Sequence, residues 1–226
     1  MQLTYYGQSC FCVNVSGKSL LFDPYITPNK LARHININDI NADYILLSHG
    51  HEDHVADAEA IAHATGATII ANYEVVTWFE KKGLKKNHSM NPGGKWAFDF
   101  GTVKCVGAVH SSSMPDESYG GIATGFVIST AEKNFYYSGD TALTIDMQLI
   151  PMFAKIDFSV LPIGDNYTMG AEEAAMAARL LQCNKVVGVH YDTFEYIIID
   201  KQKATRHFTS QNVELLLPGI GETIEL

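Results

Sequence analysis

Three histidines and two acidic residues occupy six consecutive positions of the sequence, in the order His49-Gly50-His51-Glu52-Asp53-His54. Imidazole and carboxylate groups are costly to bury unless a positive charge satisfies them. A divalent cation does this, and zinc readily accepts such a mixture of nitrogen and oxygen ligands. A polar turn with solvated histidines is the alternative, but it does not account for so dense a cluster of ligand types. The run therefore predicts a metal site.

Three further residues of ligand type lie at the ends of apolar segments that we expect to be strands. His110 follows segment 103–109, Asp140 follows segment 134–138, and His190 follows segment 186–189. Each residue alone would more often be a capping or hydrogen-bonded polar group. Together with the six-residue run they predict a ligand set gathered where strands end. Asp23 ends a similar segment, and it either supports this set or starts the turn before Pro24.

The surrounding segments predict short strands mixed with alanine-rich helices. In the N-terminal half we expect strands at 4–6, 10–15, 19–22, 44–47 and 68–71, and helices at 57–64 and 75–82. In the C-terminal half we expect strands at 96–98, 103–109, 125–129, 134–138, 158–162, 186–189 and 213–216, and helices at 170–181 and 200–208. Each half begins with strands and continues with strands mixed with helices. This repeated order favours two sheets packed face to face with helices outside. No Pro/Ser-rich linker interrupts the 226 residues, so we expect a single domain over residues 1–226.

The composition limits the classes of partner. With 46% hydrophobic and 18% charged residues the chain is an ordinary globular protein, and its formal net charge of −9 disfavours nucleic acid. The sequence contains no apolar run of about 18 residues, which is the length that would predict a membrane span. We see no signal peptide, and the four cysteines lack the spacing of a zinc finger, so we expect buried thiols and a cytoplasmic protein. The cysteines are Cys10, Cys12, Cys105 and Cys183.

The ordered set of Asp23, the run 49–54, His110, Asp140 and His190 resembles the five motifs of the metallo-β-lactamase superfamily, over nearly the whole chain. Finer features are similar to one branch, the small bacterial and archaeal metal-dependent hydrolases related to ascorbate-6-phosphate lactonase. They are 20–24 (LLFDP), 110–113 (HSSS), 161–170 (LPIGDNYTMG) and 190–194 (HYDTF). The resemblance implies an α/β fold, a four-layer αββα sandwich with the metals at one edge.

The family pattern also implies roles for these residues around two divalent metal ions. Zinc is the expected metal, with Mn²⁺, Ni²⁺ and Fe²⁺ as alternatives. Asp140 would bridge the two ions and Asp23 would support their ligands. The first ion would be held by His49, His51 and His110, and the second by Asp53, His54 and His190.

This chain departs from the family pattern at two positions. Many members of the branch carry histidine where this chain has Gln8, and a glutamine cannot carry a proton at neutral pH. An acid–base role for that position is therefore in doubt here. Asp192 raises a similar question, because relatives often have asparagine there.

The expected mechanism is hydrolysis of a small ester, lactone or phosphodiester. Two ions about 3.5–4 Å apart can share one water and lower its pKa to near 7, so that a bridging hydroxide acts as the nucleophile. Asp53 and Asp140 would be the catalytic residues, with Asp53 orienting the hydroxide or carrying its proton. Tyr167 either donates to the developing oxyanion or packs over the following helix. The residues expected to contact the substrate are Gln8, Ser112, Asp165, Asn166, Tyr167 and Tyr191.

Three other functions remain alternatives. An RNA-processing nuclease would need a basic binding surface, whereas the chain has 16 basic against 25 acidic residues. A di-iron oxidoreductase of this fold usually has a carboxylate at the position of His51, but a mono-iron oxidoreductase remains open, as does a metal-binding module without activity. The expected partners are a small-molecule substrate and a possible second copy of the chain. The apolar residues 196–199 would lie either in such a homo-oligomer interface or in the core.

Overall fold

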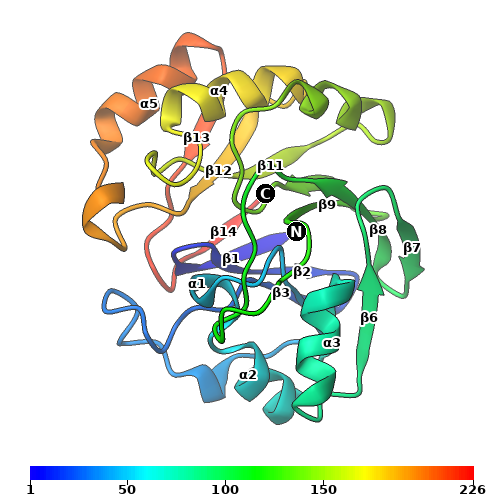
Figure 1. Ribbon diagram of the computed structural model, residues 1–226. Helices are drawn as coiled ribbons and strands as arrows, with labels where there is room; N and C mark the ends of the chain where they lie inside the picture. Colours follow the sequence, from blue (N-terminus) through cyan, green and yellow to red (C-terminus); the bar gives the residue numbers. More distant parts are fainter.

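Two mixed seven-stranded sheets form the centre of the computed structural model, which describes residues 1–226 (Figure 1). The first sheet runs in the order β14 (Thr223–Glu225), β1 (Gln2–Gly7), β2 (Cys10–Val15), β3 (Lys18–Phe22), β4 (Tyr44–Leu46), β5 (Thr68–Asn72) and β6 (Asn87–Met90). The second runs in the order β13 (Glu214–Leu216), β12 (Lys185–Val189), β11 (Phe158–Pro162), β10 (Asn134–Tyr137), β9 (Thr124–Ser129), β8 (Gly101–Gly107) and β7 (Lys95–Phe98).

Helices cover the outer face of each sheet, so that the molecule has four layers (Figure 1). On the first sheet lie α1 (Glu52–Val55), α2 (Ala58–Thr65) and α3 (Tyr73–Lys81); on the second lie α4 (Ala171–Leu180) and α5 (Lys201–Ser210). Three 3₁₀ helices complete the structure: η1 (Ile37–Asp39), η2 (Ile145–Met152) and η3 (Glu195–Ile197). The α/β four-layer sandwich is as predicted. None of the helices is long and apolar enough to cross a membrane.

The alternation of side chains along β2 shows how the sequence builds these layers. Phe11 and Val13 enter the core between the two sheets, where residues of both sheets meet. Cys10 and Cys12 point the other way and pack under α2 and α3. This follows from the two-residue period of a strand, and it confirms that the two thiols share a face. All four cysteines are free and buried, as expected.

Parallel pairing brings the ends of the strands that carry candidate ligands to one edge of the sandwich. In the first sheet β3 pairs parallel to β4, and in the second β10, β11 and β12 are parallel neighbours. The loops that follow such strands emerge on the same side. Asp23 follows β3, His49 follows β4, Asp140 follows β10 and His190 follows β12. The fold therefore gathers residues that are far apart in the sequence.

Several elements differ from the sequence expectation. The strand expected at 103–109 is β8, which ends at Gly107, so His110 lies on an irregular segment three residues beyond it. No helix was predicted within the run 49–54, but its second half forms the short helix α1. The strands β6 and β14 were not predicted, because β6 is largely polar and β14 has three residues at a sheet edge. That the chain is one domain stays a prediction, which the shared central core supports.

Candidate metal centre

Two glycines allow the ligand loops to approach each other closely. Gly50 separates His49 from His51, and a Cβ atom there would lie 2.5 Å from the sulfur of Met114. Gly139 precedes Asp140 with a φ of 60°, and a Cβ atom there would lie 2.7 Å from the Cβ of Ser48. Residues with side chains would push these segments apart. Gly50 therefore lets the loop after β4 meet the segment after β8, and Gly139 lets the loop after β10 meet the loop after β4.

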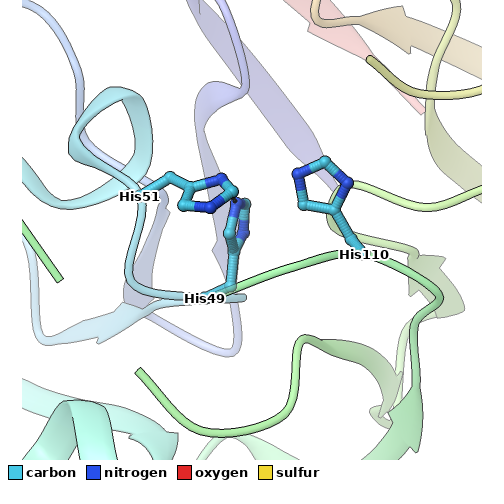
Figure 2. Close-up of side chains that lie close together, drawn as sticks. All are labelled: His49, His51 and His110. Atoms are coloured by element: carbon cyan, nitrogen blue, oxygen red, sulfur yellow. Dashed lines mark hydrogen bonds between the residues drawn. The ribbon is translucent and has the colours of Figure 1, made fainter. Parts of the chain in front are cut away.

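The first group of ligand atoms belongs to His49, His51 and His110, whose rings gather around a common space (Figure 2). All candidate ligand atoms of the group lie within 4.8 Å of one another. Nε2 of His49 is 2.9 Å from Nδ1 of His51. Burial lowers the pKa of all three histidines, and for His49 it holds the pKa well below the ordinary value. Neutral imidazoles with free lone pairs result, which is the form that binds a metal.

The second group consists of Asp53, His54, Asp140 and His190, again within 4.8 Å of one another. Oδ2 of Asp140 is 2.9 Å from Nε2 of His190 and 3.2 Å from Nε2 of His54. Oδ2 of Asp53 lies 3.4 Å from the same nitrogen of His54 and 3.5 Å from that of His190. Two carboxylates and two imidazoles thus face one point.

Asp140 connects the two groups. Besides its contacts with His54 and His190, its Oδ2 lies 3.7 Å from Nε2 of His110, which belongs to the first group. The side chain is 3% exposed, so solvent does not screen it. Asp140 is thus a buried carboxylate that faces candidate ligands of both groups.

The two carboxylates of the second group favour the presence of a positive charge between them. Burial alone would lower the pKa of His54, but the carboxylates of Asp140, Asp53 and Asp23 outweigh it and hold that pKa well above its ordinary value. For His190 burial also opposes the charge, but Asp140 and Asp53 raise its pKa to about 9. Protons on these imidazoles would compensate the acids in the absence of a metal. A divalent ion would replace those protons.

Unpartnered atoms provide a second test of this interpretation. Nε2 of His54 and Oδ1 of Asp140 are buried and have no hydrogen-bond partner. Buried polar atoms are otherwise nearly always satisfied. Because both atoms belong to the ligand group, the residues present fit a bound divalent cation.

Asp23 orients two of the histidines from behind. It is fully buried, and its carboxylate accepts hydrogen bonds from the Ser48 N–H at 2.7 Å and the Ser48 hydroxyl at 2.5 Å. It also accepts from the Tyr137 hydroxyl at 2.5 Å and from Nδ1 of His54 at 2.7 Å. Since the Ser48 hydroxyl donates to Asp23, it accepts from Nδ1 of His49 at 2.9 Å. These bonds through Nδ1 leave Nε2 of both His49 and His54 directed at the ligand groups.

Gln8 holds the second group in a similar way. Its amide donates to Oδ2 of Asp53 at 2.9 Å, and its backbone carbonyl accepts from the N–H of His190 at 2.8 Å. Gln8 is fully buried, so it lies behind Asp53 and does not contact the cleft. Gln8 therefore supports Asp53 and His190, and it is not among the residues that line the cleft, where we expected it to contact the substrate.

The ligand groups open into a cleft of about 550 Å³, a size typical of a small-molecule site. Of the residues expected to contact the substrate, Tyr167 lines this cleft. Ser112 instead bonds the backbone of Gly50 and Gly120, and Tyr191 is 5% exposed. Asp165 and Asn166 line a separate cavity beside α4 and α5.

Four other residues that line the cleft were not predicted from the sequence: Tyr25, Glu52, Ser111 and Phe194. Tyr25 stands two residues after Asp23, and Phe194 stands four residues after the candidate ligand His190. This short sequence distance from residues at strand ends is the one feature of the sequence that could have indicated a position at the cleft. In the segment 196–199, Tyr196 and Ile198 are exposed at 70% and 68%, whereas Ile197 is fully buried and Ile199 packs against the core beneath α4 and α5.

Comparison with known proteins places this geometry in a family. Residues 2–190 match the family model described as a Beta-lactamase superfamily domain. A UPF0173 metal-dependent hydrolase from Christiangramia forsetii is 52% identical over 227 residues, and one from Flavobacterium johnsoniae is 49% identical over 226 residues; each match covers all of both chains.

A solved structure shows the same architecture. Igni18, described as a novel metallo hydrolase from the archaeon Ignicoccus hospitalis, superposes with a TM-score of 0.89 at 33% sequence identity. The match covers 99% of this chain and 97% of that chain.

Proposed function

Because the chain belongs to the β-lactamase superfamily and is a metal-dependent hydrolase, we propose that it holds two divalent ions, zinc in the first instance, and hydrolyses a small ester, lactone or phosphodiester. The position of Asp140 carries this proposal. Its Oδ2 lies 2.9 Å from His190 and 3.7 Å from His110, which belong to different ligand groups. A mononuclear site would not require a buried carboxylate between two clusters.

We propose that the ligands divide between two ions as the family pattern implies. His49, His51 and His110 would hold one ion, and Asp53, His54 and His190 the other, with Asp140 between them. Bound there, the ions would supply a water that ionises near neutral pH and a Lewis acid for the scissile group.

The chain's own residues would orient the reactants and move the proton. The Asp53 side chain is 23% exposed and lines the cleft, so it can hold the attacking water and receive its proton. That proton would pass to the leaving oxygen when its bond to the carbonyl carbon or phosphorus breaks. The Tyr167 hydroxyl, also at the cleft, would donate to the oxygen on which negative charge develops.

The remaining parts of the proposal concern the setting. We retain the cytoplasm as the compartment, because four buried and unpaired thiols suit a reducing environment. We retain a small molecule as the substrate, because the cleft of about 550 Å³ suits one. A second copy of the chain remains a candidate partner for the exposed Tyr196 and Ile198.

The test is metal content per chain by elemental analysis, paired with hydrolysis of a lactone, a bis-phosphodiester and a β-lactam. We expect near two ions per chain and chelator-sensitive turnover of one substrate class. Asp140→Asn should lower the content to one ion or fewer, because the carboxylate that reaches both groups is lost. His63→Ala is the matched control, since His63 is an exposed histidine on α2 and belongs to neither ligand group.

Other results would favour the alternatives. Full activity after removal of the metal would refute the proposal. Iron in the purified protein together with oxygen consumption would favour the oxidoreductase, and cleavage of RNA alone would favour the nuclease. Two ions without turnover of any substrate would favour a binding module.

A further inference from the structure

Three aromatic side chains from three different loops form the walls of the metal cleft. Tyr25 follows β3, Tyr167 lies between β11 and α4, and Phe194 lies between β12 and α5. The ring centroids of Tyr25 and Phe194 are 6.2 Å apart, within the range of an aromatic pair. Phe194 is 37% exposed and Tyr167 is 51% exposed. Phe194 and Tyr167 therefore expose side-chain surface at the cleft, whereas Tyr25, which also lines it, is 8% exposed.

The cleft lacks positive side chains. Apart from the metal ligands and the aromatic residues, Glu52 and Ser111 line it, and there is no lysine or arginine among the lining residues. The β12–α5 connection leads to a cation, Lys201, but its ammonium pairs with Asp192 at 3.2 Å. Only the bound metals would attract an anion here.

We propose that the cleft selects a substrate whose group beside the scissile bond is uncharged and aromatic or alkyl, and that it rejects a substrate with a second anionic group. This rests on the proposed two-metal hydrolysis, which places the scissile group over the ligands. The neighbouring substituent then lies against Tyr25, Tyr167 and Phe194 and is removed from water. A carboxylate or phosphate at the same place would face Glu52 with no side-chain cation to compensate it.

Hydroxamates test this inference without requiring turnover, because they bind the metal whatever reaction the enzyme performs. The probes are acetohydroxamate, benzohydroxamate and 4-carboxybenzohydroxamate, titrated into the zinc-loaded protein. Benzohydroxamate should bind on the order of tenfold more tightly than acetohydroxamate, because its ring is buried against aromatic side chains. The added carboxylate should cancel this gain.

Variants identify the residues responsible. Phe194→Ala should weaken benzohydroxamate severalfold and leave acetohydroxamate unchanged, and Glu52→Gln should restore binding of the carboxylated probe. The matched control is Tyr196→Ala, on the same loop, since Tyr196 is 70% exposed and does not line the metal cleft. It should leave all three affinities unchanged.

The outcomes separate this inference from the proposed function. Equal affinities for the three probes, or tightest binding of the carboxylated one, would overturn the selectivity even if the enzyme hydrolyses a test substrate. Selective binding without any turnover would sink the proposed reaction and leave the selectivity standing. A protein that takes up no metal would sink both.

Discussion

Replacement of Asp23 by asparagine should both destabilise the protein and weaken metal binding, although Asp23 would not touch a metal. Its carboxylate is fully buried and receives four donors: the Ser48 N–H, the Ser48 hydroxyl, the Tyr137 hydroxyl and Nδ1 of His54. An asparagine has one acceptor oxygen and one NH₂ group in the same space. At least one donor must then face another donor.

The magnitude follows from these contacts. The less costly orientation keeps the amide oxygen at Oδ2, where three donors converge, and turns the NH₂ group toward the Ser48 N–H. The unsatisfied N–H costs about 1–3 kcal/mol, and three charge-assisted hydrogen bonds become neutral ones, each weaker by about 1 kcal/mol. Removal of the buried charge relieves a desolvation cost and offsets part of this loss. We therefore expect the free energy of unfolding to fall by about 3–5 kcal/mol in total. Weaker orientation of His54 should lower metal affinity about 10- to 100-fold.

Urea unfolding of the metal-free protein measures the first effect, and zinc affinity by competition with a chelating dye measures the second. Asp57→Asn is the matched control. Asp57 is also buried, but one of its oxygens accepts both of its backbone donors, the N–H groups of Ile26 and Thr27, so an asparagine oxygen can keep them. The control should change zinc affinity little. An Asp23→Asn protein with the stability and zinc affinity of the original would refute the role assigned to Asp23.

Three further predictions concern the site and the core. Gly164→Ala should move His190, because the new Cβ would lie 2.1 Å from the His190 carbonyl oxygen. The melting temperature and the zinc content per chain should both fall, and an unchanged zinc content would contradict this. Zinc binding at pH 7 should release protons, since the pKa of His54 is raised and that of His190 is raised to about 9; the heat of binding should therefore depend on the ionisation enthalpy of the buffer, and the contribution of His190 to this dependence should fade as the pH rises above about 9. Phe22→Ala should cost about 3–5 kcal/mol in urea unfolding, because the fully buried ring stacks on Phe11 at 4.5 Å; a loss below about 1 kcal/mol would mean that the core collapses around the gap.

The candidate ligand set could be predicted from the sequence because metal chemistry constrains residue types. The run 49–54 concentrates them in six positions, and Asp140 and His190 each follow an apolar strand. The parallel strands then bring those ends together, as the structure shows. His110 was identified for a partly mistaken reason, because β8 ends at Gly107 and an irregular segment delivers the histidine.

The cleft walls were not readable, because they depend on loop conformations. Nothing in the residue types alone distinguishes Ser111, which lines the cleft, from Ser112, which bonds the backbone of Gly50 and Gly120. Likewise Tyr167 lines the cleft and its neighbour Asn166 lines another cavity. Serine or tyrosine at a loop position has no periodic pattern that fixes its direction, in contrast to a residue on a strand.

The backbone around the metal centre carries a further constraint that links stability to function. Gln8, Asp23 and His190 adopt left-handed conformations, with φ of 52°, 40° and 57°, although none is glycine. Such conformations are unfavourable for residues with a Cβ atom, by roughly 1 kcal/mol or more each. Glycine would relieve the backbone at each position. It would, however, remove the support of Asp53 at position 8, the acceptor for His54 at position 23 and a candidate ligand at position 190. The sharp turns after the strands direct these side chains into the site, so we infer that local stability is given up where the ligands must converge.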